Sequence, residues 1–371
     1  LQDVKTDDYC PADDFFLQLQ LELQLERQTV NLKNSTADQS LSVSNATSLS
    51  SSEAALAQEI ALLLVRAGEE CLGSTESCLP TLTDIRHKVW PQVQALTDCT
   101  GDAFLPASLD SEQVIGESVC SSGTSMFYRH VWKAAGHSVF ENLEAISSHF
   151  EQTTYTPFCE KFHEATSKKK AFTYVREPIS RYISAYAEIE FRIREGLTEY
   201  DALAEALSAY PAGSSERAAE FFRQYLKDGI HQDGHLRTQM ECFTPIRGCA
   251  VPYDFIGKVE SMEEDWAHLL SPLCGSNVSF NDSLGLHPND DQDKGAMEIV
   301  LNWKTDDPPA DHASAMAILL QEGEGRYLRA LCWLLLVDFV TLKYDLPAEC
   351  QQGLLNSTMM ALRHQALNHT S

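Results

Sequence analysis

The chain has few basic residues for its length. Its 371 residues include 28 Lys and Arg against 54 Asp and Glu, which gives a formal net charge of −26 at pH 7. Proteins that bind nucleic acids or anionic membranes meet phosphate groups with a surplus of Lys and Arg. The deficit therefore disfavours both classes, and any anionic ligand must bind in a locally basic pocket. More weakly, the charge also argues against a long polyanionic glycan as the substrate.

Long hydrophobic runs are also absent. The longest run, Leu331–Val337, is far shorter than the ~20 residues that span a bilayer, and Asp338 follows it. The sequence begins at Leu1, and nothing nearby has the basic-then-apolar layout of a signal peptide. We therefore expect a processed or truncated form that is soluble as it stands.

No CxxC pair occurs among the 11 cysteines, although such pairs are typical of zinc sites. Cys71 and Cys78 are seven positions apart, as are Cys242 and Cys249. This spacing favours disulfide bonds over metal binding, and disulfides persist in the secretory pathway. The odd count leaves at least one free or intermolecular thiol, and no metal site is predicted.

Asn-x-Ser/Thr sequons are more frequent than chance placement predicts. They occur at Asn34, Asn45, Asn277, Asn281, Asn356 and Asn368. Coincidence is one interpretation, because two of them lie in the Ser-rich segment 34–52. The favoured interpretation is N-linked glycosylation of a protein in the secretory pathway.

The first 112 residues give mixed signals. Residues 12–30 alternate Leu and Gln within a helix-favouring composition, so periodicity does not separate helix from strand, and we favour a helix. Residues 31–52 are rich in Ser, Thr and Asn, which predicts a flexible, glycosylated linker. Ala54–Ala67 has the apolar spacing of an amphipathic helix, and the chain beyond Cys71 is predicted to be loop up to about residue 112.

From Ser125 onwards the pattern changes to strand, turn and helix. The first unit has a predicted strand at Ser125–Val131 and a helix at Ser138–Ser148. The second has a strand at Ala171–Val175 and a helix at Ile179–Arg194, with Pro178 suited to its first turn. Further strands and helices are indicated at Tyr253–Val259, Met262–Leu270 and Arg326–Leu342. This alternation predicts an α/β domain with a mainly parallel sheet.

The turn of the first unit has the properties of an anion site. Its sequence, WKAAGHS, runs from Trp132 to Ser138. Small residues let backbone N–H groups approach an oxyanion, the following helix adds its positive dipole end, and Lys133 supplies a mobile charge. The Lys precedes the small residues, so this is not the GxxxxGK[ST] loop of P-loop kinases. Taken alone, the pattern fits an ordinary tight turn equally well.

The second strand–turn–helix unit favours the anion-site interpretation of the first turn. Its turn and helix read REPISRYISAY from Arg176 to Tyr186, with Ser184 two helical turns beyond the Arg. With the Lys loop, this resembles the RDPxxRxxSxY signature of sulfotransferases, Glu177 standing for the usual Asp. Tyr253–Asp265, beginning YDFIGKVE, looks like the YDFIGKFE segment of Golgi carbohydrate sulfotransferases. His235, Cys242 and Cys249 also fall where that family often has a His and a cysteine pair.

The resemblance covers about residues 120–346 and implies a donor site. In the family the Lys loop binds the 5′-phosphosulfate of PAPS (3′-phosphoadenosine-5′-phosphosulfate), and the Arg and Ser bind its 3′-phosphate. The implied cofactor-binding residues are Lys133, Ala134, Ala135, Gly136, His137, Ser138, Arg176 and Ser184, with PAP (3′-phosphoadenosine-5′-phosphate) as the product. His137 departs from the usual Thr or Ser and Trp132 from the usual Pro. The hydroxyl role of the loop then passes to Ser138 or to the His137 ring.

The resemblance also implies an architecture and a location. The expected fold is a P-loop-like sulfotransferase α/β fold, with a central mainly parallel sheet flanked by helices and a helical or irregular N-terminal extension. The expected divisions are an extension at 1–110, a sulfotransferase domain at 111–350 and a tail at 351–371. The expected location is the Golgi lumen, with the full-length protein anchored in the membrane through a segment outside this sequence.

Several residues are candidates for the base that activates the acceptor hydroxyl. Family members use a His or Glu between the Lys loop and the Arg-containing strand, and the candidates there are His149, Glu160, His163 and Glu164. Histidine is favoured because its unperturbed pKa lies near neutrality, and we choose His163 first and His149 next. His235 is a substrate-side candidate or a structural histidine. The expected catalytic residues are therefore Lys133, His163 and His235, and no metal is required because PAPS already carries a good leaving group.

Three functions remain open at this point. The first, which we favour, is transfer of a sulfuryl group from PAPS to an acceptor hydroxyl on a glycan, with a small-molecule alcohol as the alternative acceptor. The second is a P-loop kinase, for which the GK[ST] sequence is missing. The third is an inactive, sulfotransferase-like binding module, which would have lost residues equivalent to Lys133 or Arg176, and both are present. The run Lys168–Lys170 is a basic rim for an anionic ligand or a solvated charge run, and we favour the latter.

Overall fold

The computed structural model describes residues 50–73, 78–98, 113–155, 169–194, 196, 198–212, 214–227, 233–243, 253–275, 278–281 and 325–369. The chain divides into two compact units, residues 1–48 and 49–371, and the description below concerns the second. The helix expected at 12–30 and nearly all of the linker expected at 31–52 lie outside the described residues.

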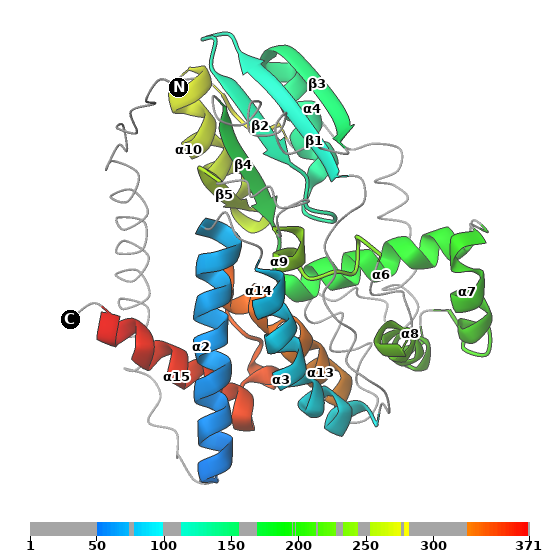
Figure 1. The fold of residues 1–371 in the computed structure, drawn as a ribbon. Coiled ribbons are helices and arrows are strands. Elements are labelled where there is room, and N and C mark those ends of the chain that lie inside the picture. Colours follow the sequence, from blue (N-terminus) through cyan, green and yellow to red (C-terminus); the bar gives the residue numbers. More distant parts are fainter. Residues whose placement is uncertain are drawn as a thin grey trace, which may run out of the picture. The chain divides into compact units, whose positions relative to one another are not determined.

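A five-stranded sheet forms the centre of the α/β part (Figure 1). The strands are β1 (Gln113–Cys120), β2 (Ser125–Arg129), β3 (Ser147–Tyr155), β4 (Lys170–Val175) and β5 (Phe255–Lys258), in the order β3-β1-β2-β4-β5. The neighbours β2, β4 and β5 are parallel, whereas β1 is antiparallel to both β2 and β3. All strands of this sheet except β1 therefore point the same way, which confirms the expected α/β fold with a mainly parallel sheet.

The sheet is apolar on a face that two helices cover. Side chains alternate between the faces of a strand, so Met126 and Tyr128 of β2 point to the same side. They form one buried cluster with Phe172 and Tyr174 of β4 and with Val139, Phe140 and Leu143 of α4 (Gly136–Ile146). Trp266 of α10 (Met262–Cys274) completes it. At roughly 1.5–3 kcal/mol for each fully buried large apolar side chain, this cluster holds α4 and α10 firmly on the sheet.

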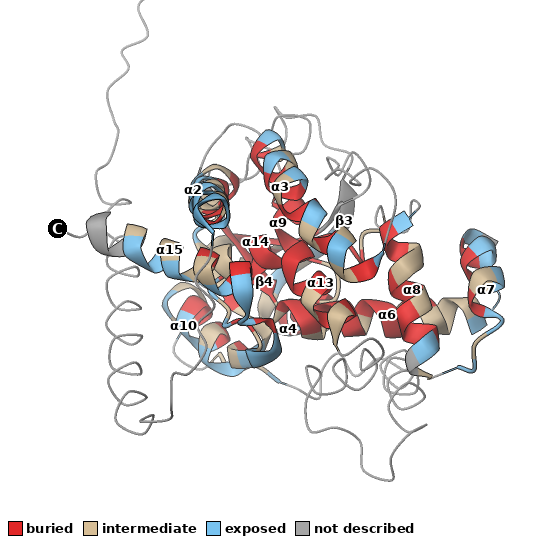
Figure 2. Ribbon diagram, turned by 90° about the horizontal axis from the view of Figure 1, so that it is seen from below, coloured by how far each residue is buried: buried red, intermediate tan, exposed pale blue. Residues whose placement is uncertain are grey.

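The other helices of the described residues bury a second, larger cluster. They are α2 (Ser51–Gly73), α3 (Leu79–Thr97), α6 (Pro178–Arg194), α7 (Asp201–Leu207), α8 (Ser215–Lys227), α9 (Gln239–Cys242), α13 (Arg326–Leu334), α14 (Leu336–Thr341) and α15 (Gly353–His369), with 3-10 turns at Thr198–Tyr200, Val259–Ser261 and Ala348–Cys350. Figure 2 shows α13 and α14 almost wholly buried, whereas α2 and α15 keep an exposed side. The expected element at Arg326–Leu342 is thus two helices, which meet at Leu335.

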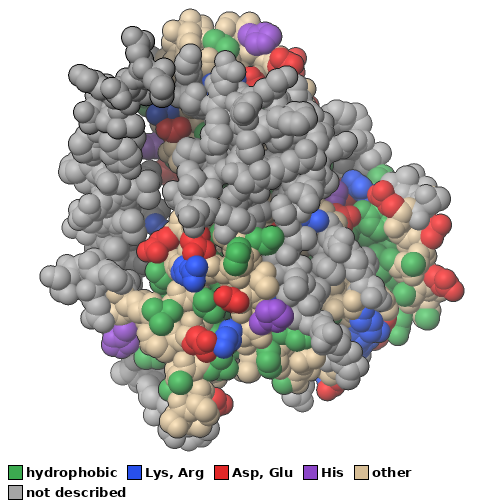
Figure 3. Space-filling view, viewed as in Figure 1, with side chains coloured by type: hydrophobic (Ala, Val, Ile, Leu, Met, Phe, Trp, Pro, Cys, Tyr) green, Lys and Arg blue, Asp and Glu red, His purple; other side chains and the backbone are tan. Residues whose placement is uncertain are grey.

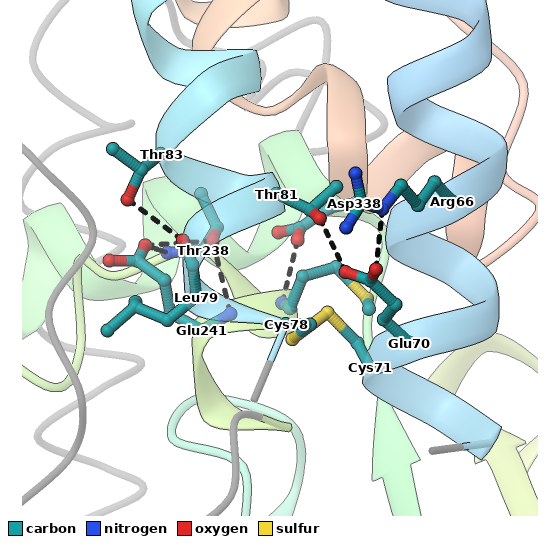
Figure 4. The surroundings of a disulfide bond; sticks show 11 residues. Arg66, Glu70, Cys71, Cys78, Leu79, Thr81, Thr83, Thr238, Glu241 and Asp338 are labelled. Carbon is teal, nitrogen blue, oxygen red and sulfur yellow. Dashed lines mark hydrogen bonds and ion pairs between the residues drawn. A yellow bond between two sulfur atoms is a disulfide. The ribbon is translucent and has the colours of Figure 1, made fainter. Parts of the chain in front are cut away.

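The expected loop between Cys71 and residue 112 is wrong in its first part, because α3 occupies Leu79–Thr97. Ile85, Val89 and Val93 are buried at helical spacing, and Pro80 stands in the first turn, where its missing N–H costs nothing. The Pro at position 91, inside the helix, obscured this period in the sequence. Figure 4 shows how α3 joins α2: a disulfide links Cys71 to Cys78, and the carboxylate of Glu70 accepts hydrogen bonds from Arg66 and Thr81.

The N-terminal and C-terminal helices pack together. α2 contacts α15, α14 and α3, and α3 contacts α13. The domain boundaries proposed at 110 and 350 remain predictions. None of the described helices is both long enough and apolar enough to cross a membrane.

Disulfide bonds are present, and Cys71–Cys78 is one that the cysteine spacing predicts. The same spacing of Cys242 and Cys249 does not correspond to a bond, because Cys242 is free. Besides Cys71–Cys78, the described bonds are Cys120–Cys274, which links the end of β1 to the end of α10, and Cys332–Cys350. Cys242 is a buried free thiol, and burial raises its pKa.

Three of the six sequons fall among the described residues. Asn281 and Asn356 are exposed, and Asn368 lies in α15. Asn34, Asn45 and Asn277 lie outside the described residues. Glycosylation at all six positions stays a prediction.

Candidate active site

The two turns singled out from the sequence meet at one edge of the sheet. β2 and β4 are parallel neighbours, so the loop that follows β2 and the turn that follows β4 emerge side by side at their carboxyl ends. The first carries Lys133 and leads into α4, and the second carries Arg176 and leads into α6. This is the edge where open α/β sheets bind ligands.

The backbone of the first loop is unusual. Lys133 and Ala135 both have left-handed φ angles, 64° and 57°, which non-glycine residues seldom adopt. Such residues persist where the surroundings impose them, and they cluster at functional sites. Gly136 is required for space, because a Cβ there would lie 2.0 Å from Nε2 of His130. Ala134 is buried, Ser138 is half-buried and His137 is exposed.

The side chain of His130 packs against this loop. Its ring packs against those of Trp132 and Phe140, at centroid distances of 4.8 and 5.7 Å. Nδ1 of His130 is buried without a hydrogen-bond partner among the described residues. Burial, reinforced by repulsion from His137 and His235, lowers the pKa of His130 to about 3.

This pKa predicts a stability change on acidification. Below the ordinary histidine pKa of 6.5 the unfolded chain binds a proton at His130, whereas the folded chain does so only near a pKa of about 3. The free energy of unfolding should therefore fall as the pH falls through this window, by about 1–2 kcal/mol at about pH 5. In denaturant titrations at about pH 8 and about pH 5, His130→Gln should lose correspondingly less stability than the wild type. An equal loss in both proteins would assign the effect to other groups.

The second turn forms a pre-organised cation and hydroxyl pair. Nη1 of Arg176 donates to Oγ of Ser184 at 2.7 Å, and both side chains are half-buried. Glu177 replaces the expected Asp and acts as a helix cap. Its carboxylate accepts from the N–H of Ile179 at 3.2 Å and of Ser180 at 2.7 Å. The longer side chain thus still satisfies two of the first N–H groups of α6.

One face of α6 lines the site beyond this pair. Glu188, one turn after Ser184, forms an ion pair with Lys133 at 2.9 Å and a second with Arg192 at 2.7 Å. The Lys133 and Glu188 side chains are 14% and 16% exposed, so the pair is shielded yet reachable from solvent.

Arg181, also on α6, has a structural role. Its buried guanidinium donates to three backbone carbonyls: Trp132 at 2.8 Å, Gly234 at 3.2 Å, and Arg237. It therefore fastens the Lys133 loop to the segment around His235.

His235 lies next to that loop with a carboxylate partner. The rings of His235 and Trp132 are 4.9 Å apart, and Nδ1 of His235 is 2.6 Å from Oδ1 of Asp233. Asp233 also accepts a hydrogen bond from the hydroxyl of Tyr200. Burial alone would raise the pKa of Asp233, but the bond and charge of His235 outweigh it and lower that pKa. A carboxylate that holds Nδ1 leaves Nε2 as the nitrogen for proton transfer.

Of the other base candidates, His149 lies among the described residues. His163, Glu160 and Glu164 lie outside the described residues. His149 is on the edge strand β3, where it pairs with Val119, which in turn pairs with Ser125 at the start of β2. It therefore sits at the opposite edge of the sheet from Lys133, one strand length or about 15 Å away. The geometry rules out His149 as the base for chemistry at this site.

Lys169 and Lys170 of the basic run also lie at that opposite edge, and Lys168 is outside the described residues. Lys169 pairs with Glu117, and Lys170 pairs with Asp254 at 2.7 Å. Both described lysines are thus paired with carboxylates.

Sequence reasoning missed four residues of the site: His130, Glu188, Asp233 and Gln239, the last of which hydrogen-bonds to the backbone of Arg176. The Asp-x-His spacing of Asp233 and His235 was a usable signal, because it places a carboxylate within reach of an imidazole. The Thr238-x-x-Glu241 pattern is a capping box, which marks the start of α9 at Gln239. Nothing in the sequence pairs Glu188 with Lys133, since that contact depends on how α6 packs.

The comparisons with known proteins agree with this site. Residues 117–292, which include both turns and His235, match a family described as the sulfotransferase family. Carbohydrate sulfotransferase 14 of Mus musculus is 34% identical over 102 residues, and that of Homo sapiens is 33% identical over 99 residues. Each match covers 25% of this chain and 26% of the relative, so the matched stretch spans about a quarter of those proteins. No solved structure matches. Residues 117–292 of the chain therefore resemble the sulfotransferase family, and a shorter stretch resembles the carbohydrate sulfotransferases.

Proposed function

We propose that the chain transfers a sulfuryl group from PAPS to a hydroxyl of a carbohydrate acceptor. The observation that carries this proposal is the meeting of the Lys133 loop with the Arg176–Ser184 pair at the carboxyl edge of β2 and β4. These residues fit the donor. The loop offers N–H groups at the start of α4, and the Arg–Ser pair offers a charged and a neutral donor for a phosphate.

Each cation has a distinct role in this proposal. PAPS supplies an activated sulfuryl group and a phosphate leaving group. Arg176 and Ser184 bind the 3′-phosphate and so fix the position of the nucleotide. Lys133, which is paired with Glu188 in this structure, would supply the positive charge that stabilises the leaving phosphate as its charge develops.

His235, which lies beside Trp132 of the Lys133 loop, is the base in this proposal. Nε2 of His235 takes the proton of the acceptor hydroxyl while Asp233 holds the ring and stabilises the imidazolium. His163 remains the alternative, in the segment outside the described residues.

The acceptor class rests on the relatives and on charge. The matched relatives are named as carbohydrate sulfotransferases, and a glycosylated, disulfide-bonded enzyme of the secretory pathway, in the Golgi lumen, would meet such acceptors. On the face drawn in Figure 3, acidic and basic side chains intermingle over the described surface of α2 and α3. With a net charge of −26, a neutral or lightly charged acceptor suits the chain better than a polysulfated one.

Labelled PAPS tests the proposal. The chain is incubated with labelled PAPS and with desulfated glycans, their polysulfated counterparts or small alcohols at low and moderate salt. Transfer to the desulfated glycans is the expected result. Transfer to small alcohols alone would overturn the carbohydrate assignment, and nucleotide binding without transfer to any acceptor would identify an inactive binding module.

Removing either member of the Arg–Ser pair should weaken product binding. A charge-assisted contact with phosphate contributes about 1.5–3 kcal/mol, so Arg176→Ala should lower the affinity for PAP by about 10–150-fold. Ser184→Ala should cost less, because its hydroxyl is neutral. Calorimetry measures both values, with Lys170→Ala as a control at the opposite sheet edge. Unchanged affinity in both variants would sink the assignment of the 3′-phosphate site.

A further inference from the structure

Gln239 makes an unusual pair of contacts with Arg176. The backbone N–H of Arg176 donates to Oε1 of Gln239 at 2.9 Å, and Nε2 of Gln239 donates to the carbonyl of Arg176 at 2.7 Å. One side-chain amide thus satisfies both backbone groups of one residue. β4 ends at Val175, so the amide of Gln239 takes the place of a neighbouring strand just beyond the last residue of β4.

The backbone of Gln239 is in turn held by a residue of α14. Its side chain is fully buried, and its N–H donates to Asp338 at 2.8 Å. The same buried carboxylate accepts from the N–H of Met240 at 2.9 Å. The capping box of Thr238 and Glu241, drawn beside Asp338 in Figure 4, completes the support of α9. Burial raises the pKa of Asp338 to about 6, although both N–H groups oppose the shift.

These contacts bear on the guanidinium of Arg176. A rigid backbone at Arg176 limits where its side chain can go, and the hydrogen bond to Ser184 then selects one direction. If the backbone were free, the side chain would have to be ordered when the anion binds, and that ordering would cost affinity.

We propose that Gln239 is a positioning residue for the 3′-phosphate site: it fixes the backbone of Arg176, and Asp338 fixes Gln239. This inference rests on the proposed function, since it assumes that Arg176 binds the 3′-phosphate of the donor. A purely structural Gln239 would change stability without changing the recognition of that phosphate.

Two nucleotides separate these roles. PAP and adenosine 5′-monophosphate differ only in the 3′-phosphate, so their affinity ratio reports on that contact alone. In calorimetry, Gln239→Glu and Gln239→Ala should bind PAP roughly tenfold more weakly and bind adenosine 5′-monophosphate as the wild type does. Gln239→Glu keeps the size of the side chain but loses the donor to the Arg176 carbonyl. In an Arg176→Ala background, Gln239→Glu should cause no further loss of PAP affinity.

Thr358→Val is the matched control. Thr358 is buried in α15 and donates to the carbonyl of Leu354 at 2.9 Å, so its loss removes a buried hydrogen bond away from the site. It should lower stability and leave the affinity ratio unchanged. Hydrogen exchange of the wild type adds a measurement that needs no variant. PAP should slow exchange in peptides around both Arg176 and Gln239, and adenosine 5′-monophosphate should do so in neither.

The outcomes distinguish the inference from the proposed function. If the wild type binds both nucleotides equally, the donor site itself is wrong. If the wild type and Arg176→Ala differ as expected, the Gln239 variants test the positioning role. Gln239 is not a positioning residue if these variants keep the wild-type ratio of the affinities for PAP and adenosine 5′-monophosphate. The same conclusion follows if they lose both affinities together. Exchange around Gln239 that does not respond to PAP would overturn it as well.

Discussion

Lys133→Ala should lower kcat about 100- to 1,000-fold while changing the affinity for PAP by less than about tenfold. The reason is that the charge of Lys133 is needed most when the leaving phosphate develops charge, so its loss affects the transition state more than the bound state. In the resting structure Lys133 is held by Glu188 at 2.9 Å. Its charge is therefore already balanced there, and binding of the nucleotide gains little from it.

Single-turnover kinetics and calorimetry on the same preparations measure the two quantities. Lys169→Ala is the matched control, because Lys169 also pairs with a carboxylate, Glu117, but does so at the opposite edge of the sheet. It should leave both quantities near the wild-type values. Equal losses of kcat and of PAP affinity in Lys133→Ala would mean that this lysine only binds the nucleotide.

The strand and helix pairs around the site could be predicted because their patterns are local. Ser125–Val131 and Ala171–Val175 have strand composition, and both are strands, with small differences at the ends. β1 was missed because its sequence, QVIGESVC, alternates weakly and contains Gly116. That glycine is needed because a Cβ there would lie 2.9 Å from the ring of Phe140, a contact that only the packing of α4 creates.

The residues of the site also separate into those that a local sequence pattern predicts and those that depend on packing. The Lys loop and the Arg–Ser spacing are encoded in short segments, so the sequence alone placed both. Asp338 is 99 positions from Gln239 and 98 from Met240, the two residues whose N–H groups it binds. Gln239 is 63 positions from Arg176. Such pairs depend on the tertiary arrangement of α9, α14 and β4, and no local sequence pattern predicts them.

The structure changes the order of His149 and His235 as candidates for the catalytic base. His149 is the second choice from the sequence, because it is a histidine between the two turns, where the resemblance places the base. The register of β3 places it at the far edge of the sheet. His235 lies after both turns in the sequence, yet Arg181 holds its segment against the carbonyl of Trp132. Proximity in space therefore favours a residue that sequence order had ranked lower.

His235→Ala should lower kcat about 100- to 10,000-fold, the range typical for loss of a positioned general base. Asp233→Asn should have a smaller effect in the same direction, because the ring remains but loses the carboxylate that orients Nδ1 at 2.6 Å. The pH profile gives a second readout. Wild-type kcat should fall on the acid side, since a protonated imidazole cannot accept the proton of the hydroxyl, and His235→Ala should lose this dependence.

His149→Ala is the control for this prediction, because His149 is an exposed histidine at the opposite sheet edge. It should keep both the wild-type kcat and the acid-side fall. Addition of imidazole to His235→Ala should restore part of the activity, since the cavity left beside Trp132 and Asp233 can hold the missing ring. If His235→Ala keeps its turnover and its acid-side fall, the base is elsewhere and His163 becomes the residue to replace. PAP affinity should stay unchanged in His235→Ala, because His235 acts on the acceptor and the nucleotide is held by Arg176 and Ser184.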